Sequence, residues 1–561
     1  MFDLRKLRGK IIFISLGIIS TIWFLFRVIP KPSRATYPCM RAAAPFMSGF
    51  IIYLMSVWGA VIISRNTRLK WLNVRYISSS ILVFSVIALM AITPVENDLT
   101  EDEAVVKTGT EDGPNQPLGK GVGINPGRVV WAWNPEATNE KALNAFYLHT
   151  PENTNQEIVS EMFADGIKQL TGKKNLKKAW DELFRDFNKR KNSADRGYSK
   201  GEKIFIKINQ GTANGKLRPD DIKNGFYIPK RMTDSDRAMQ GLEGTCETYP
   251  NVVLELLREL VNEAGIEQKD ISIGDPISHI FGHNYDIWHS EFPDVVYVDK
   301  TSENSGRTII KPTEQDLIFY SDKTKSDKLY DIIENADYMI NVANLKPHGR
   351  AGISLTAKNH FGSHGRQSAF HLHYSLISPV SLGKPTNNGY RKYRVFVDIM
   401  GSKYLGQNTM LYIVDGLFGG GSNETRVPVK YFMPPFNNDW SNSIFLSQDQ
   451  VAIESVCFDF LRNEWNGTYV HNAANNSYEA IPSVYGVDDY LHQAADRGKW
   501  PEGIVYDPDK SGNPVGSLGV HEHWNDPVSK QYSGNLGKKG GIELISIPEN
   551  LVKSEGVAKR Q

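Results

Sequence analysis

The segment Pro250–Asp275, PNVVLELLRELVNEAGIEQKDISIGD, holds the pattern that decides the fold. Over Pro250–Ala264 the apolar residues recur every three or four positions, which predicts one buried face of a helix. The helix opens on a proline and closes at Gly265, as helices commonly do. Ile271–Gly274 then predicts a short buried strand that ends at an aspartate. A helix leading into a short apolar strand is the repeating unit of an α/β fold.

The same alternation continues on both sides of this segment. Further strands are predicted at Arg128–Trp133, Lys203–Asn209, Val295–Val298, Tyr338–Val342 and Leu411–Val414, and further helices at Gln156–Leu170, Leu176–Lys191, Lys328–Glu334 and the stretch that follows Ser447. Short apolar strands between amphipathic helices predict an α/β domain with a mainly parallel sheet and helices on both faces. We expect this domain to span residues 124–546, with a tail at 547–561.

A different composition marks the first hundred residues. Three stretches there contain no Asp, Glu, Lys or Arg: Ile11–Phe26, Pro45–Ser64 and Ile77–Thr93. A helix needs about 17–25 apolar residues to cross a bilayer. We therefore predict a transmembrane region of three helices at 1–94 and a polar linker at 95–123, with two spans as the alternative. A cleaved signal peptide would explain the first stretch alone.

The distribution of Lys and Arg around these stretches predicts the orientation. With the N-terminus inside the cell, the inner segments carry the basic groups of Arg5–Lys10 and Arg65–Arg75. Lys and Arg favour the cytoplasmic side of a membrane. The large domain is therefore expected outside the cytoplasm, although the basic first loop opposes this orientation.

Charge and cysteine content exclude several classes of function. The 64 basic and 63 acidic residues nearly balance, and the soluble part has no block of Lys and Arg, which argues against a nucleic-acid partner. Cys39, Cys246 and Cys457 cannot supply a four-thiolate iron–sulfur cluster from this chain alone. Cys457 lies on the apolar face of a predicted helix and is expected in the core.

Polar residues end several of the predicted strands. They are Lys207, Asn209, Asp275, Asn341 and Asp415. Each of them alone is more often a turn former or a helix cap. Ligands of an open parallel sheet, however, bind outside the carboxyl ends of its strands. Because the polar residues recur at equivalent ends, we predict that they share one crevice.

The segment Asn341–Arg366, NVANLKPHGRAGISLTAKNHFGSHGR, is the densest in functional groups. Among glycines and small residues it carries Lys346, His348, Arg350, Lys358, His360, His364 and Arg366. Accessible backbone N–H groups beside fixed cations suit an anionic ligand such as a carboxylate or a phosphate. A solvated basic loop is the alternative interpretation.

These motifs resemble those of the domain of unknown function 362 family. Asn341–Gly362 resembles its signature, with a strand ending in Asn, a Lys-x-His pair and a Lys-Asn-x-Phe-Gly turn, and Lys203–Asn209 (KIFIKIN) resembles an earlier lysine-bearing strand. Ile124–Asn139 (INPGRVVWAWNPEATN) resembles the opening of longer, membrane-attached bacterial members. The resemblance implies attachment to a bacterial plasma membrane but no established reaction. Some relatives carry a ferredoxin-like module, and this chain lacks the cysteines for one.

Two pairs of histidines are candidate metal ligands. His371 and His373 form one pair, and His521 and His523, on either side of Glu522, form the other. In an extended segment each pair points two imidazoles to one side, where zinc or another divalent ion could accept them. His492 would complete a set if the fold brought it near. Two ligands alone do not make a site, and surface histidines are the alternative.

The leading functional hypothesis is an enzyme that acts on an anionic small molecule or envelope component. Lys207, Lys346 and Lys358 would bind charge, Asn209, Asn341 and Asn359 would orient the ligand, His348 or His364 would move a proton, and Asp275 or Asp415 would orient that histidine or hold a metal. A desolvated lysine could also act as base or Schiff-base former. The cofactor is unknown, with a divalent metal as the candidate.

The rival hypothesis is a non-catalytic accessory subunit of a membrane complex for electron transfer or envelope assembly. The three predicted spans, and the loop Pro38–Arg41 between the first two, would then dock a membrane partner protein. A partner that co-purifies at constant stoichiometry from mild detergent would favour this hypothesis over the enzyme.

Overall fold

The computed structural model describes residues 113–142, 148–211, 246–299, 306–348, 350–377, 390–421, 428–466 and 486–552. They all belong to one unit of the chain, Glu103–Gln561. The three predicted membrane spans, and residues 95–112 of the predicted linker, lie outside this described part. Within it, no helix combines the length and the apolar character that crossing a bilayer requires.

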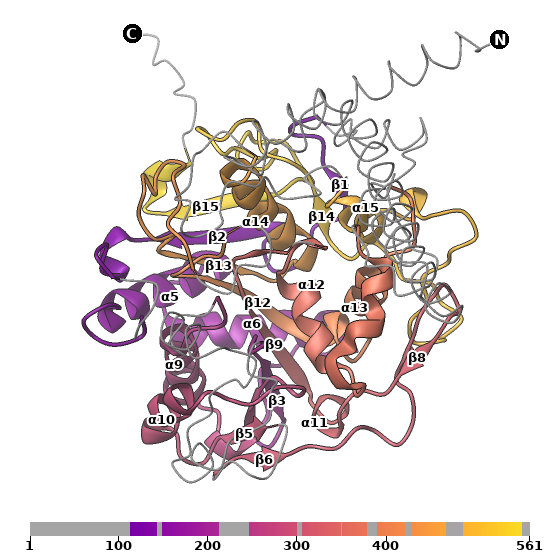
Figure 1. Cartoon of the computed structure of the whole chain (residues 1–561), viewed down its shortest axis with the longest axis horizontal. Coiled ribbons are helices and arrows are strands. Elements are labelled where there is room, and N and C mark those ends of the chain that lie inside the picture. The colour runs from indigo at the N-terminus through magenta and orange to yellow at the C-terminus, as the bar shows by residue number, and fades with distance from the viewer. Residues whose placement is uncertain are drawn as a thin grey trace, which may run out of the picture. The chain divides into compact units, whose positions relative to one another are not determined.

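A large sheet forms the centre of the domain (Figure 1). Its nine strands in the described part are ordered β15 (Glu543–Ile547), β2 (Arg128–Trp133), β13 (Ser443–Ser447), β12 (Thr409–Gly416), β9 (Tyr338–Asn344), β3 (Ile204–Lys207), β4 (Ile271–Gly274), β5 (Val296–Asp299) and β6 (Thr308–Ile309). Strand β13 is antiparallel to both of its neighbours, and all other neighbours pair in parallel. The predicted mainly parallel sheet is thus confirmed.

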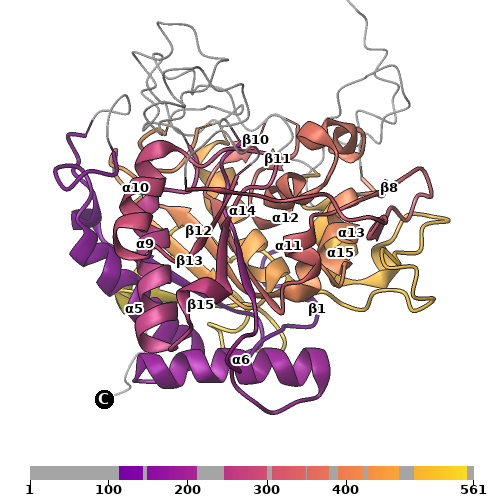
Figure 2. The same ribbon diagram turned by 90° about the horizontal axis from the view of Figure 1, so that it is seen from below.

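Helices cover both faces of the sheet, as predicted, and Figure 2 shows the two groups on opposite sides. One face packs against α5 (Gln156–Thr171), α6 (Leu176–Asn192), α9 (Pro250–Arg258) and α10 (Gly282–Glu291). The other packs against α11 (Asp331–Glu334), α12 (Thr356–Asn359), α13 (Val395–Gly401), α14 (Gln450–Glu464) and α15 (Asp489–Ala495). Alternate strand residues point to opposite faces, so Ile204 and Ile206 join the first core and Phe205 joins the second.

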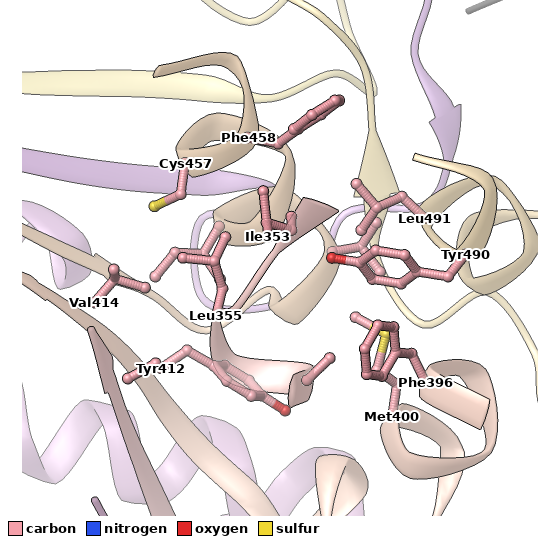
Figure 3. Close-up of a cluster of buried hydrophobic side chains, with 14 of the residues drawn as sticks. Ile353, Leu355, Phe396, Met400, Tyr412, Val414, Cys457, Phe458, Tyr490 and Leu491 are labelled. Carbon is pink, nitrogen blue, oxygen red and sulfur yellow. The ribbon is translucent and has the colours of Figure 1, made fainter. Parts of the chain in front are cut away.

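The second core is built around α14, which is almost completely buried, including polar residues such as Glu454, Ser455 and Asp459. Figure 3 shows Cys457 of α14 near Val414 of β12, and Phe396 of α13 near Tyr490 of α15. Cys457 is fully buried with a free thiol, which confirms that it is a core residue. Burial favours its neutral form and holds the pKa of the thiol well above its ordinary value.

Two short pairs of strands lie beside the large sheet and carry residues of interest. Strand β10 (Pro347–His348) pairs with β11 (Gly352–Ile353), and β1 (Leu118–Gly119) pairs with β14 (Val520–His521), antiparallel in both cases. Strand β1 lies inside the predicted linker, and β14 contains one of the paired histidines.

Candidate functional site

A buried polar network joins the carboxyl ends of β3 and β4 and the middle of β9 to helix α12. We call Lys207, Asp275, Asn341 and Asn359 the strand-end network. The Lys207 ammonium lies 3.1 Å from Asp275 Oδ1 and donates to Asn359 Oδ1 at 3.0 Å. Lys207 and Asn341 are fully buried, and the other two are nearly so. Because parallel strands end at the same edge of a sheet, residues distant in sequence meet here.

The two asparagines of the network hold α12 against the sheet. Asn359 Nδ2 donates to Asn341 Oδ1 at 2.8 Å, and Asn341 Nδ2 donates to the Thr356 carbonyl at 2.9 Å. Asn341 Nδ2 also lies 2.9 Å from His360 Nε2. These bonds satisfy amides that would be costly to bury without partners. The network therefore fixes the helix that carries Lys358.

The charges inside the network balance each other. Burial lowers the pKa of Lys207, and the Asp275 carboxylate opposes that shift. Gly362 packs directly over the pair, since a Cβ there would lie 2.0 Å from Asp275 Oδ1 and 2.9 Å from Lys207 Nζ. The last residue of the Lys-Asn-x-Phe-Gly turn is a glycine because the ion pair leaves no room for a side chain there.

Next to the network lies a partly exposed group of basic side chains. Lys346, His348, Arg350 and Lys358, which we call the basic rim, are all partly buried. The Lys346 ammonium donates to Asn209 Oδ1 at 2.8 Å and to the Cys246 carbonyl. Asn209 also lies 3.4 Å from Asn359 Oδ1, which connects the rim to the strand-end network.

His348 is held as a neutral imidazole. Its Nδ1 accepts backbone N–H groups from Arg350 and Ala351, both at 3.1 Å, so that its proton belongs on Nε2. Burial lowers the pKa of His348 far below its ordinary value, and the positive charge of Lys358 lowers it further. His373, Lys346 and Arg350 act in the same direction. His348 thus lies among positive groups.

Two of the predicted catalytic residues lie apart from this rim. His364 is buried, its Nδ1 lies 2.8 Å from the His360 carbonyl, and burial lowers its pKa to about 4 in spite of the nearby Asp327. Asp415 points to the opposite face of the sheet, where it accepts the backbone N–H groups of Tyr249 at 2.8 Å and Leu417 at 3.1 Å. It holds the start of α9.

The first pair of predicted metal ligands does not form a chelating group in the described part. His371 Nε2 lies 2.6 Å from Asp327 Oδ2, and His373 Nδ1 lies 3.1 Å from the Phe370 carbonyl. Both histidines are in the irregular helix Gln367–Ser375. Because that segment is helical rather than extended, the assumption behind the predicted pair does not hold there.

The second pair does meet further ligands. His521, His523 and Asp488 offer ligand atoms that all lie within 4.8 Å of one another. His492 Nε2 is 4.0 Å from Asp488 Oδ2, and the rings of His492 and His521 lie 4.8 Å apart. We call these four buried residues the imidazole cluster. Strand β14 and helix α15, which carry or adjoin them, lie next to each other (Figure 1).

Two aspartates of this region were not predicted from the sequence. Asp488 stands four residues before His492, a spacing that puts both on one side of a helix and could have been noticed. Asp459 of α14 lies 2.8 Å from His523 Nδ1, and only the fold brings the two together. Burial opposes protonation of His523, but Asp459 and Asp488 raise its pKa to about 9.

Residues 240–459 match the family model described as "Domain of unknown function (DUF362)". The match supports membership of the DUF362 family. It covers β4, β9, β12, β13, the basic rim and most of the strand-end network. Lys207, helix α15 and strand β14 lie outside the matched residues. No curated protein and no solved structure matches the chain.

One carboxylate joins the DUF362 segment to the imidazole cluster. Glu454 of α14 accepts the Thr356 hydroxyl at 2.6 Å and the Ala357 N–H at 2.8 Å, at the start of α12. It also accepts the hydroxyl of Tyr490, in α15. The helix that carries Lys358 and the helix that carries His492 are therefore anchored to the same side chain.

Proposed function

We propose that the chain is an enzyme that binds an anionic small molecule at the basic rim. The observation that carries this proposal is the set of positive groups around His348, namely Lys346, Arg350 and Lys358. Three cations held beside a neutral imidazole, at the end of a parallel sheet, suit a carboxylate or phosphate ligand. Chemistry at such a site would use these cations to stabilise negative charge that develops on the bound molecule.

The histidine and the lysines would have different roles. Since Nδ1 of His348 accepts two backbone N–H groups, its Nε2–H is the group that would donate to the ligand. Lys346 and Lys358 would supply charge. Lys207 and Asp275 already neutralise each other, so we assign them the role of holding α12 and Gly362 in place. A metal is not needed for any of these interactions.

The location of the domain is part of the same proposal. The apolar stretches between residues 11 and 93, and the basic residues around them, support attachment to a membrane with the domain outside the cytoplasm. The ligand would then be an extracytoplasmic metabolite or envelope component. Protease digestion of the domain in intact spheroplasts would support this location, and digestion only after lysis would contradict it.

The ligand proposal can be tested by thermal unfolding of the full-length protein with inorganic phosphate or citrate. We expect either anion to raise the unfolding midpoint of the wild type, because bound ligands stabilise the folded state. Lys358→Ala should reduce that rise and keep the midpoint without ligand nearly unchanged. Lys178→Ala is the matched control, since Lys178 is an exposed lysine on α6, on the other face of the sheet.

Two results would contradict the proposal. One is a wild-type protein whose midpoint neither anion changes. The other is a Lys358→Ala variant that responds to the anion as strongly as the Lys178→Ala control.

A further inference from the structure

We propose that the imidazole cluster is a structural Zn²⁺ site in which His492, His521, His523 and Asp488 bind the ion. This inference is independent of the basic rim and of the proposed enzyme function. It rests on the identity of the four side chains, their spacing, their burial and the groups that orient them.

The donor atoms lie close enough together for one ion to draw them into a tetrahedron. Zinc binds histidine nitrogen and carboxylate oxygen at about 2.0–2.1 Å, which puts two ligands of a tetrahedron about 3.3 Å apart. His523 Nε2 and Asp488 Oδ2 are 3.2 Å apart. His521 completes a group of three whose donor atoms lie within 4.8 Å of one another. His492 Nε2 lies 4.0 Å from the same oxygen and would have to move toward the other donors to become the fourth ligand. One carboxylate and three imidazoles form a donor set that zinc accepts.

A second layer of residues holds two of the imidazoles in the tautomer that binds metal. The Ser455 hydroxyl donates to the Val451 carbonyl at 2.7 Å, so it accepts from His521 Nδ1 at 2.8 Å. His523 Nδ1 lies 2.8 Å from Asp459 Oδ1. With the proton on Nδ1, Nε2 is the nitrogen that would bind an ion. At His523 the ion would take the place of the Nε2 proton shared with Asp488. Metal-bound histidines usually have such a partner behind them.

Asp459 itself is held in place by several donors. Its carboxylate accepts the Trp524 N–H at 3.0 Å and the Tyr532 hydroxyl at 2.8 Å, and Arg462 lies 3.0 Å from it. Asp488 accepts the Tyr390 hydroxyl. A fixed second layer is characteristic of a built metal site rather than of a chance meeting of polar side chains.

The imidazole cluster is buried, but a surface pocket reaches it from one side. All four proposed ligands are buried, with exposed fractions between 0 and 6 %. His523 nevertheless lines a surface pocket of about 370 Å³, together with Arg462, Asn463, Asn525 and Asp526. This pocket would be the route by which an ion reaches the cluster. Four protein ligands without an open position indicate a structural role.

The direction of the Glu522 side chain shows that His521 and His523 both point to the other side of their segment. Between His521 and His523, the Glu522 side chain accepts backbone N–H groups from Ser533 and Ile542, away from the two imidazoles. An extended segment points alternate side chains to opposite sides. The two histidines therefore share one side and face Asp488, as a His-x-His chelate requires.

The test is the metal content of the full-length protein, purified without chelators or metal-affinity steps. We expect about one zinc per chain by elemental analysis. The double variant Asp488→Asn/His521→Gln should lose it. His371→Gln, which removes a histidine that pairs with Asp327 elsewhere, should keep the full zinc content.

Co²⁺ substitution provides a measurement that does not depend on the variants folding. Wild-type protein stripped of zinc and given one equivalent of Co²⁺ should show the strong visible absorption of a tetrahedral cobalt site. The proposal is overturned if the stripped wild type gives only the weak spectrum of aqueous Co²⁺, or if the folded double variant binds zinc as well as the wild type does.

Discussion

The strand-end network and the imidazole cluster are both buried and polar, but they are completed in different ways. In the network, Lys207 and Asp275 balance each other and the asparagines satisfy the rest. The cluster gathers three imidazoles and a carboxylate, and a second carboxylate orients one of the imidazoles from behind. One buried polar group thus pairs opposite charges within the protein, while the other combines three imidazoles and a carboxylate, a set of side chains that zinc accepts.

The largest loss of stability is expected from breaking the ion pair between Lys207 and Asp275. Lys207→Met should lower the free energy of unfolding by ~3–5 kcal/mol, because it leaves the Asp275 carboxylate buried without its counter-charge. Urea unfolding would measure the loss, and adding Asp275→Asn should restore part of it. A loss below ~1 kcal/mol would show that the pair is not what holds this end of the sheet together. The zinc content should not change.

Removal of zinc from the imidazole cluster should also destabilise the protein. At a free zinc concentration 100 times the dissociation constant, binding contributes about 2.7 kcal/mol to folding. Addition of a strong chelator should therefore lower the unfolding midpoint of the wild type, and excess zinc should restore it. The midpoint of Asp488→Asn/His521→Gln should not respond to either treatment. An equal response of both proteins would mean that zinc acts elsewhere.

A smaller loss is expected from crowding the strand-end network. Gly362→Ala would place a methyl group 2.0 Å from Asp275 Oδ1, so the ion pair or the turn must move. Overpacking of this kind costs ~1–3 kcal/mol, measurable by urea unfolding. Gly516→Ala is the matched control, because Gly516, like Gly362, has no positive φ and nothing lies within 4 Å of the added atom. If Gly362→Ala is no worse than this control, the close contact is not limiting.

Within any one pH unit, the smallest change in stability is expected from the titration of Asp415. Burial raises the pKa of Asp415 from 3.8 to about 7, while the N–H groups of Tyr249 and Leu417 oppose the shift. The folded state thus holds this proton more tightly than the unfolded chain does. Its stabilising contribution is complete below pH 3.8 and is lost as the pH rises through 7.

Asp415→Asn removes this titration, so it isolates the effect. The variant should be less stable than the wild type at pH 4, because its amide cannot accept both N–H groups. The difference in free energy of unfolding between wild type and variant should decrease toward pH 7, by at most ~1.4 kcal/mol for each pH unit. Unfolding curves at several pH values would measure it. A constant gap would mean that Asp415 is ionised throughout this range.

The fold class and the meeting of the strand ends could be predicted because both follow from local patterns. The short apolar strand at Ile271–Gly274, after an amphipathic helix, implies a parallel sheet, and parallel strands place Lys207 and Asp275 at one edge. The face of the sheet to which each of these side chains points could not be predicted as easily. Asp415 ends its strand at the same edge, but it points to the face of α9.

The imidazole cluster was only half predictable, for a different reason. The pair His521 and His523 is visible as a local pattern, and Asp488 with His492 is visible as a helical spacing. Nothing in the sequence says that a short extended segment will lie against that helix, since this contact depends on how both pack on α14. Asp459, on α14, could therefore be assigned to His523 only from the structure.

The pairing of β15 with β2 has a consequence for how the protein is made. Arg128–Trp133 lies early in the domain, yet its outer partner is Glu543–Ile547, more than four hundred residues later along the chain. During synthesis on the ribosome, the edge of β2 that pairs with β15 stays uncovered until most of the polypeptide has been made. Unpaired strand edges invite association with other chains. Nascent chains that stall before residue 543 should accordingly be the form that depends most on chaperones.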